Sequence, residues 1–184
     1  MPTLTEYAAN FPGFAVPPEL VKLVAFDTSA GNQFYSDGFE LSTDRRGDLD
    51  SWSKDPEFVA QLMPFAQATG GGSFYALWLN GTSQDLSTVP VVVFGDEGGV
   101  HIVAENLADL LRILTFDAEP SIDVDRVYYY RSDDQTPSKK HDAYVTWLKT
   151  ELGLEPLEEA DAVVESAQAK LKPAFDAWLA RYVS

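Results

Sequence analysis

The segment Phe74-Tyr75-Ala76-Leu77-Trp78-Leu79 constrains the fold more than any other stretch of this sequence. Successive side chains of a β-strand point to opposite faces of the sheet, and here both alternating sets are apolar. A strand with one face in water would instead alternate apolar and polar residues. The segment therefore predicts a strand buried on both sides, in a sheet whose two faces or far end are covered by helices.

Three further segments extend this predicted sheet. Residues 63–68, 90–94 and 99–104 are short and largely apolar, and a glycine-containing turn over residues 95–99 joins the last two. Leucines at positions 107, 110, 111 and 114 then follow the i, i+3, i+4, i+7 spacing of an amphipathic helix. Strands and helices of this kind together predict an α+β domain.

The N-terminal part is predicted to contribute two helices and a hairpin. Pro17-Pro18-Glu19 opens a helix, because proline suits the first helical turn. Residues 33–41 carry Asp37-Gly38 between two apolar pairs, which is the pattern of a β-hairpin turn. Asp55-Pro56-Glu57 predicts a short helix that reaches about Leu62.

Beyond the amphipathic helix, residues 122–130 are expected to form an edge strand or an extended connection. A further helix is expected over residues 140–152. Gly153 follows this helix directly, and glycine at that position is a common helix stop.

The last segment, residues 157–182, follows a helical period but contains Pro173. Proline inside a helix removes a backbone hydrogen bond and clashes with the preceding turn. We therefore expect two separate helices here, over residues 158–171 and 173–182.

The run Gly70-Gly71-Gly72 raises the question of phosphate binding. A phosphate-binding loop places its glycines between a strand and a helix N-terminus, and a P-loop adds lysine and a hydroxyl residue. Here the glycines lead through Ser73 into a strand, with no lysine nearby. We therefore expect a strand-to-strand connection in which glycine permits positive φ or a close backbone approach, and the same holds for Gly98-Gly99.

The balance of charge separates the possible classes of partner. The chain has 13 Lys and Arg residues against 29 Asp and Glu residues, a formal net charge of −16. Nucleic acid is itself a polyanion, so nucleic-acid binding is disfavoured. A basic protein partner would be attracted at long range, although an acidic surface also serves solubility alone.

Length and composition fit a single domain over residues 1–184. Without cysteine the chain has no disulfide and no thiolate ligand for zinc. Its apolar runs reach about six residues, far fewer than the ~20 that a membrane-spanning helix needs. Residues 1–10 show neither the basic residue nor the apolar core of a signal peptide, so a cytoplasmic location is expected.

Candidate catalytic residues are few. His101 lies in a predicted strand and His141 begins a predicted helix, and neither stands at metal-ligand spacing, so we expect no metal and no cofactor. Asp96 and Glu97 adjoin each other at a predicted turn, where paired carboxylates could serve a hydrolase together with His101. Adjacent acids at a turn are usually only solvated, so catalysis is the least favoured interpretation.

An ordered set of short motifs resembles one known family. The motifs are Phe14-x-x-Pro17-Pro18-Glu19-Leu20, Phe65-x-x-x-x-Gly70-Gly71-Gly72-x-x-Tyr75-x-Leu77-x-Leu79, Pro90-Val91-Val92-Val93, Gly98-Gly99 and Asn106-Leu107-Ala108-Asp109-Leu110-Leu111. In this order they resemble the SUKH superfamily, which includes the fungal cell-wall-assembly regulators and many bacterial immunity proteins. The resemblance covers about residues 11–116, so that residues 117–184 would form a helical C-terminal extension.

The resemblance implies an α+β fold with one central, mostly antiparallel sheet and helices packed around it. It also implies protein binding rather than catalysis, most concretely an immunity protein that binds and neutralises a toxin such as a basic nuclease. A regulator or scaffold that binds an endogenous partner is the alternative. The candidate partner-binding residues are acids in loops near the sheet edge: Asp44, Asp48, Asp50, Asp96 and Glu97.

Overall fold

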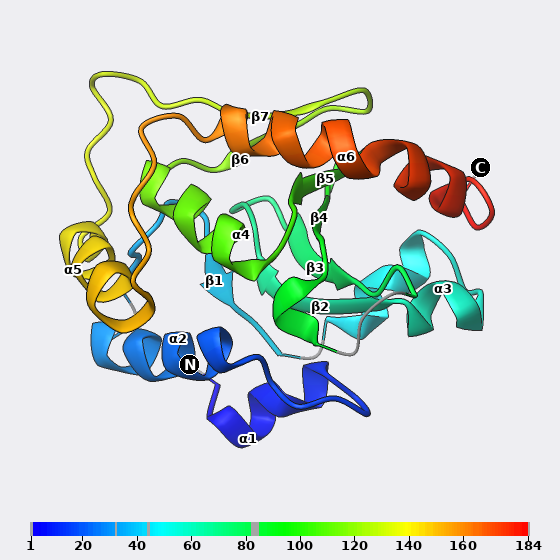
Figure 1. Cartoon of the computed structure of the whole chain (residues 1–184), viewed down its shortest axis with the longest axis horizontal. Coiled ribbons are helices and arrows are strands. Elements are labelled where there is room, and N and C mark those ends of the chain that lie inside the picture. Colours follow the sequence, from blue (N-terminus) through cyan, green and yellow to red (C-terminus); the bar gives the residue numbers. More distant parts are fainter. Residues whose placement is uncertain (1, 32, 44, 82–84, 184) are drawn as a thin grey trace.

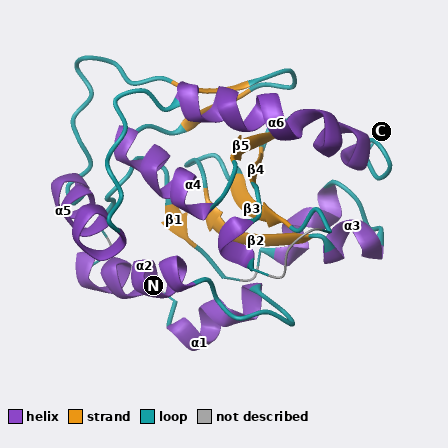
Figure 2. Ribbon diagram, viewed as in Figure 1, coloured by secondary structure: helices purple, strands orange, loops and turns teal. Residues whose placement is uncertain are grey.

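The computed structural model describes residues 2–31, 33–43, 45–81 and 85–183. They form an α+β fold in which helices surround a five-stranded antiparallel sheet (Figure 1, Figure 2), as the fold-class prediction expects. The strands are β1 (Glu40–Leu41), β2 (Leu62–Gln67), β3 (Phe74–Trp78), β4 (Val91–Phe94) and β5 (Val100–Ala104). Their order in the sheet equals their order in the chain.

Each strand of the main sheet pairs antiparallel with the next one along the chain. Every residue of β3 is buried, so the segment that most constrains the fold is covered on both sides. An antiparallel sheet of this order places alternate turns at the same end. The turn between β2 and β3 therefore lies beside the turn between β4 and β5, and this juxtaposition forms the candidate site below.

Six α-helices lie among the described residues, and short 3₁₀ or π turns join or continue several of them. The α-helices are α1 (Leu4–Tyr7), α2 (Pro18–Ala30), α3 (Pro56–Ala60), α4 (Leu107–Ile113), α5 (His141–Trp147) and α6 (Asp161–Leu179). The predicted starts of α2 and α3 are confirmed: α2 begins with proline, and the Asp55 carboxylate accepts a hydrogen bond from the Glu57 amide at the start of α3. The Asn106 side chain caps α4 in the same way.

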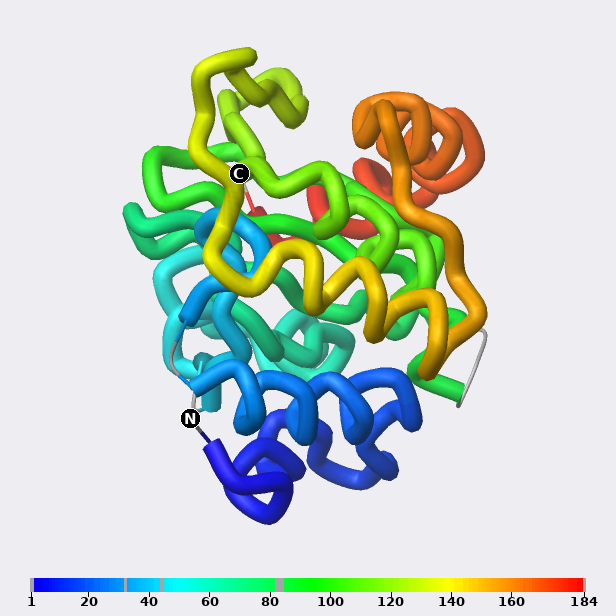
Figure 3. Tube along the Cα trace, turned by 90° about the vertical axis from the view of Figure 1, so that its left-hand side faces the viewer, coloured from blue at the N-terminus to red at the C-terminus, as the bar shows by residue number. Residues whose placement is uncertain are grey.

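The first face of the sheet, which carries Tyr75, Leu77 and Val93, packs against α1, α2, α4 and α5. Buried leucines of α2 and α4 and the Tyr144 ring of α5 belong to this core. Helices α2 and α5 lie side by side (Figure 3), and the Phe26 ring of α2 contacts the ring of Tyr144.

The second face carries the other half of each central strand, including Phe74, Trp78 and Phe94. It packs against η2, a 3₁₀ segment over Arg46–Ser51, and against α3 and α6. Phe175 of α6 is 1% exposed and its ring meets the Trp78 ring edge-on at 5.0 Å. The expectation that helices cover both faces is therefore confirmed, and α6 in the C-terminal segment supplies one of these covers.

Two short strands, β6 (Pro120–Ile122) and β7 (Val127–Tyr129), form a separate antiparallel hairpin. The region expected as an edge strand or extended connection thus contains an edge strand, β7, but in this separate hairpin and not in the main sheet. The hairpin lies against the main sheet at Gly99, where a Cβ atom would lie 2.2 Å from the carbonyl oxygen of Asp123. Gly99 also has φ +85°, so both space and backbone conformation require glycine there.

The predicted hairpin over residues 33–41 is wrong. Glu40 and Leu41 pair with β2, not with the residues before Gly38. Those residues are held by other partners: the Lys140 amide donates to the Phe34 carbonyl, and the Asp37 amide donates to a buried carboxylate. Tertiary contacts thus use the backbone groups that a local hairpin would have paired.

The prediction of two helices separated at Pro173 is also wrong, because α6 is continuous from Asp161 to Leu179. Pro173 lies on its exposed side, whereas Val164, Ala167 and Phe175 are buried. Packing of that apolar stripe on the sheet outweighs the hydrogen bond that proline removes.

Candidate functional site

An open groove of about 690 Å³ lies on the second face, at the end of the sheet where two turns meet. One wall is η2 with the adjoining Arg45 and Trp52, and the other is formed by residues 71–72 and by Gly95, Asp96 and Gly98. The rings of Phe74 and Phe94 form the floor, stacked with centroids 4.8 Å apart and planes 6° from parallel. The groove thus combines an apolar floor with polar walls, as a protein-binding surface does.

Arg45 fixes the η2 wall to the sheet. Its guanidinium donates to the Asp48 carboxylate at 2.9 Å, to the Gln67 side-chain oxygen at 2.8 Å and to the Ser42 hydroxyl at 3.1 Å. The Arg45 side chain is 18% exposed, and its bonds reach both β2 and its own segment. Asp48 is therefore held in place by this pair, and part of its charge is neutralised.

Asp96 is fixed on the opposite wall by Ser73. The Ser73 hydroxyl donates to Asp96 Oδ1 at 2.5 Å, and the Asp96 amide donates back to the Ser73 hydroxyl at 3.1 Å. A Cβ atom at Gly71 would lie 2.6 Å from Asp96 Oδ2. Glycine at this position therefore allows the carboxylate to approach the turn.

The triple glycine is the connection between β2 and β3, as predicted. The Gly72 amide donates to the Thr69 carbonyl at 3.3 Å, which closes the turn. The Gly70 amide donates to the Glu119 carboxylate at 2.7 Å. One glycine amide thus binds an anionic oxygen, but the anion is a side chain of the same protein.

The structure brings only some of the predicted acids together. Asp48 of η2 and Asp96 of the turn after β4 both line the groove. Asp50 is exposed on η2, and Glu97 is exposed in the turn after β4, both outside the lining. Asp44 lies outside the described residues.

The residues considered for a hydrolase do not converge. His101 pairs with Val93 on the first face, where its Nε2 lies 2.7 Å from the Asp123 carbonyl oxygen. Asp96 faces the groove on the second face, and Glu97 is exposed at the turn. General acid–base catalysis needs such groups within hydrogen-bond reach of one substrate, and these three lie on different sides of the sheet.

Asp117 is a buried carboxylate that sequence reasoning missed. It is 1% exposed and accepts hydrogen bonds from the Asp37 amide and from the amide and hydroxyl of Ser138. His141 Nδ1 lies 3.8 Å away. This cluster ties the segment before β1 to α5.

Within the described ranges, no three His, Asp or Glu side chains are grouped as metal ligands.

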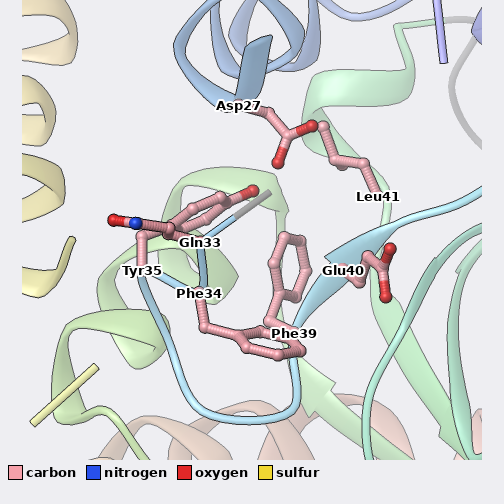
Figure 4. Close-up of a pocket in the computed structure, with 7 residues that line it drawn as sticks. All are labelled: Asp27, Gln33, Phe34, Tyr35, Phe39, Glu40 and Leu41. Atoms are coloured by element: carbon pink, nitrogen blue, oxygen red, sulfur yellow. The ribbon is translucent and has the colours of Figure 1, made fainter. Parts of the chain in front are cut away.

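A second pocket, also missed, opens between α2, the segment before β1 and β1 itself (Figure 4). Its volume is about 240 Å³, and Asp27, Tyr35 and Glu40 are among its lining residues. A signal for it existed in the sequence: Asp27 follows Leu20 at i+7 on the apolar stripe of α2, where an acid is out of place.

Burial and the nearby Glu40 carboxylate raise the pKa of Asp27. The Tyr35 hydroxyl is buried, and no hydrogen-bond partner for it lies in the part of the chain that the structure describes. Burial, and secondly the Asp27 carboxylate, raise the pKa of Tyr35 well above its usual value, so this hydroxyl keeps its proton.

No family model, no curated protein and no solved structure matches this chain. In the part of the chain that the structure describes, every helix is too short or too polar to cross a membrane.

Proposed function

We propose that this chain is a non-catalytic, cytoplasmic protein-binding domain that recognises a basic protein partner through the groove between η2 and the β4–β5 turn. The observation that carries this proposal is that Asp48 and Asp96, from segments far apart in the sequence, line one groove together with the aromatic rings of Phe74 and Phe94. The net charge of −16 would steer a basic partner towards such a surface.

In its most concrete form, the partner is a toxin, such as a basic nuclease, and binding neutralises it. The support for this form is the ordered set of motifs that resembles the SUKH superfamily, together with the acidity of the chain. Complementary charge speeds association, which suits a protein that must capture a toxin before it acts.

The test is to co-express the chain with the protein encoded by the adjacent gene and to measure both cell survival and association rates. The double variant Asp48→Asn, Asp96→Asn removes two charges but keeps side-chain oxygens that accept the bonds from Arg45 and Ser73. We expect the association rate to fall about tenfold and to depend less on salt.

The matched control is Asp133→Asn with Asp134→Asn, which removes the same charge from exposed positions outside the groove. An equal loss in both double variants would contradict a role for the groove and leave only a general charge effect. Binding without protection of the cells would favour the regulator or scaffold over the immunity protein. Absence of any binding to the neighbouring protein would count against the immunity form.

A further inference from the structure

The pocket of Asp27 and Tyr35 is separate from the groove, because its buried residues belong to the core of the first face. In Figure 4 the Asp27 carboxylate and the Tyr35 hydroxyl turn towards the same space, with the Phe39 ring beside them. The residues that line this pocket include two acids and no base. Its charge is therefore negative, and three of its seven lining residues, Phe34, Tyr35 and Phe39, are aromatic.

Tyr35 is the exception among the buried tyrosines. Tyr7 donates to the Phe65 carbonyl, Tyr144 donates to the Leu111 carbonyl, and Tyr75 bonds to the hydroxyl of Tyr129. Tyr35 is 2% exposed and lines a pocket, yet among the described residues its hydroxyl has no partner. A buried polar group is normally hydrogen-bonded, so an unpaired hydroxyl at a pocket indicates a place for a ligand.

The aromatic walls favour a cation as this ligand. Phe34 is 53% exposed and lines the pocket, so its ring is open to a ligand. The ring of Phe39 lies 5.9 Å from that of Tyr35. Aromatic faces attract cations through their quadrupole, and the two carboxylates add direct charge attraction.

We propose that this pocket binds a guanidinium group, the group that an arginine side chain carries. A guanidinium is planar, stacks on aromatic rings and donates several hydrogen bonds from a rigid fork. It can donate to Asp27 and to the Tyr35 oxygen together while its charge faces Glu40. An ammonium is a compact point charge that matches flat aromatic walls less well.

The test is an NMR titration of the isotopically labelled protein with N-acetyl-arginine methylamide. The neutral citrulline analogue, which has nearly the same shape, is the ligand control. We expect saturable shifts at Asp27, Phe34 and Tyr35 with the arginine compound only. Equal shifts with the citrulline compound, or tighter binding of butylammonium than of the arginine compound, would overturn the proposal.

Two variants test the assigned contacts. Asp27→Asn is expected to weaken binding about tenfold, and Tyr35→Phe about threefold, because the first removes a charged acceptor and the second a neutral one. Spectra that are unchanged outside the pocket show that each variant is folded. Unaltered affinity in a folded Asp27→Asn variant would contradict the site.

Further measurements distinguish a small-molecule guanidinium from an arginine side chain, and the pocket from the groove. Tighter binding of free arginine than of the blocked compound identifies a small-molecule ligand, whereas equal or weaker binding identifies a side chain of a peptide or protein; both support the pocket. The groove variant Asp48→Asn, Asp96→Asn is expected to bind the arginine compound unchanged. Failure of the groove to bind a protein therefore leaves this proposal standing, and the reverse also holds.

Discussion

The two faces of the sheet hold their covers in different ways. On the first face, hydroxyls of Tyr7 and Tyr144 reach backbone carbonyls, and the hydroxyls of Tyr75 and Tyr129 bond to each other. The buried aromatic residues of the second face are phenylalanines and Trp78. The first face is thus joined by apolar contact and by buried tyrosine hydroxyls, whereas the second combines aromatic contact with hydrogen bonds from longer polar side chains, such as that from Gln168 Nε2 to the Ile102 carbonyl.

This difference affects how well each face tolerates a substitution in one of its covering helices. Several separate helices cover the first face, so the loss of one contact leaves the others in place. The long helix α6 makes up much of the cover of the second face, through residues such as Phe175 and Ala167. The second face should therefore be more sensitive to changes in one element, and the four predictions below test this comparison in order of expected effect.

The largest effect is expected for Phe175→Ala. It removes a buried ring that contacts both Trp78 and Trp178, and such truncations cost about 3–5 kcal/mol of unfolding free energy. Urea denaturation followed by tryptophan fluorescence measures the loss. Glu165→Ala, an exposed change on the same helix, should stay within about 0.5 kcal/mol. A loss below about 1 kcal/mol for Phe175→Ala would show that α6 is dispensable to the second core.

Pro173→Ala should instead strengthen the cover of the second face. Alanine restores the missing backbone donor on the exposed side of α6. We expect the free energy of unfolding to rise by about 2 kcal/mol, because the gain in the helix exceeds the added conformational entropy of the unfolded chain. Amide hydrogen exchange should slow in α6 and stay unchanged in α2. Equal slowing in both helices would argue that the two faces unfold as one unit.

A matched pair of substitutions tests the hydroxyls of the first face. Tyr75→Phe removes a 2.8 Å bond and leaves the Tyr129 hydroxyl unpaired, at an expected cost of about 1–2 kcal/mol. Tyr35→Phe removes a hydroxyl that has no partner and should be neutral or slightly stabilising. Thermal denaturation compares them directly, and equal losses would contradict the assigned difference.

The smallest effect is expected for Asp27→Asn, and it depends on pH. Because the folded-state pKa of Asp27 is raised, the folded protein binds this proton more tightly than the unfolded chain does. Stability is then lost as pH rises through the raised pKa, so removing the charge should raise Tm at pH 7. The gain should vanish as pH falls below the ordinary aspartate value of 3.8. Asp133→Asn, at an exposed position, should change Tm little at either pH.

The sheet could be predicted because its signals are local. Apolar residues on both alternating faces of β3 require cover on both sides, and glycine turns mark the ends of its neighbours. The pairing of β1 with β2 in place of the predicted hairpin could not be foreseen, because the residues before β1 are held by contacts such as that of Asp37 with Asp117, far along the chain. The continuity of α6 through Pro173 likewise depends on a surface supplied by the sheet.

The candidate site was predicted in part. Asp48 and Asp96 were placed in loops near the sheet edge, and the structure puts both in one groove. Their separation in the sequence hides this, because the groove forms only when η2 reaches the end of the sheet where the two turns meet. The sequence gives a weaker signal for the Asp27 pocket, namely a single acid on the apolar stripe of α2. The other lining residues come from β1 and the segment before it.

The position of α6 along the chain also affects how the protein is made. The ribosome completes all five strands, which end at Ala104, well before it reaches Asp161. During that interval the Trp78 ring lacks α6, whose Phe175 and Trp178 rings contact it in the native state. Exposed aromatic strands of this kind aggregate readily, so the newborn chain should benefit from chaperones that shield them until α6 arrives.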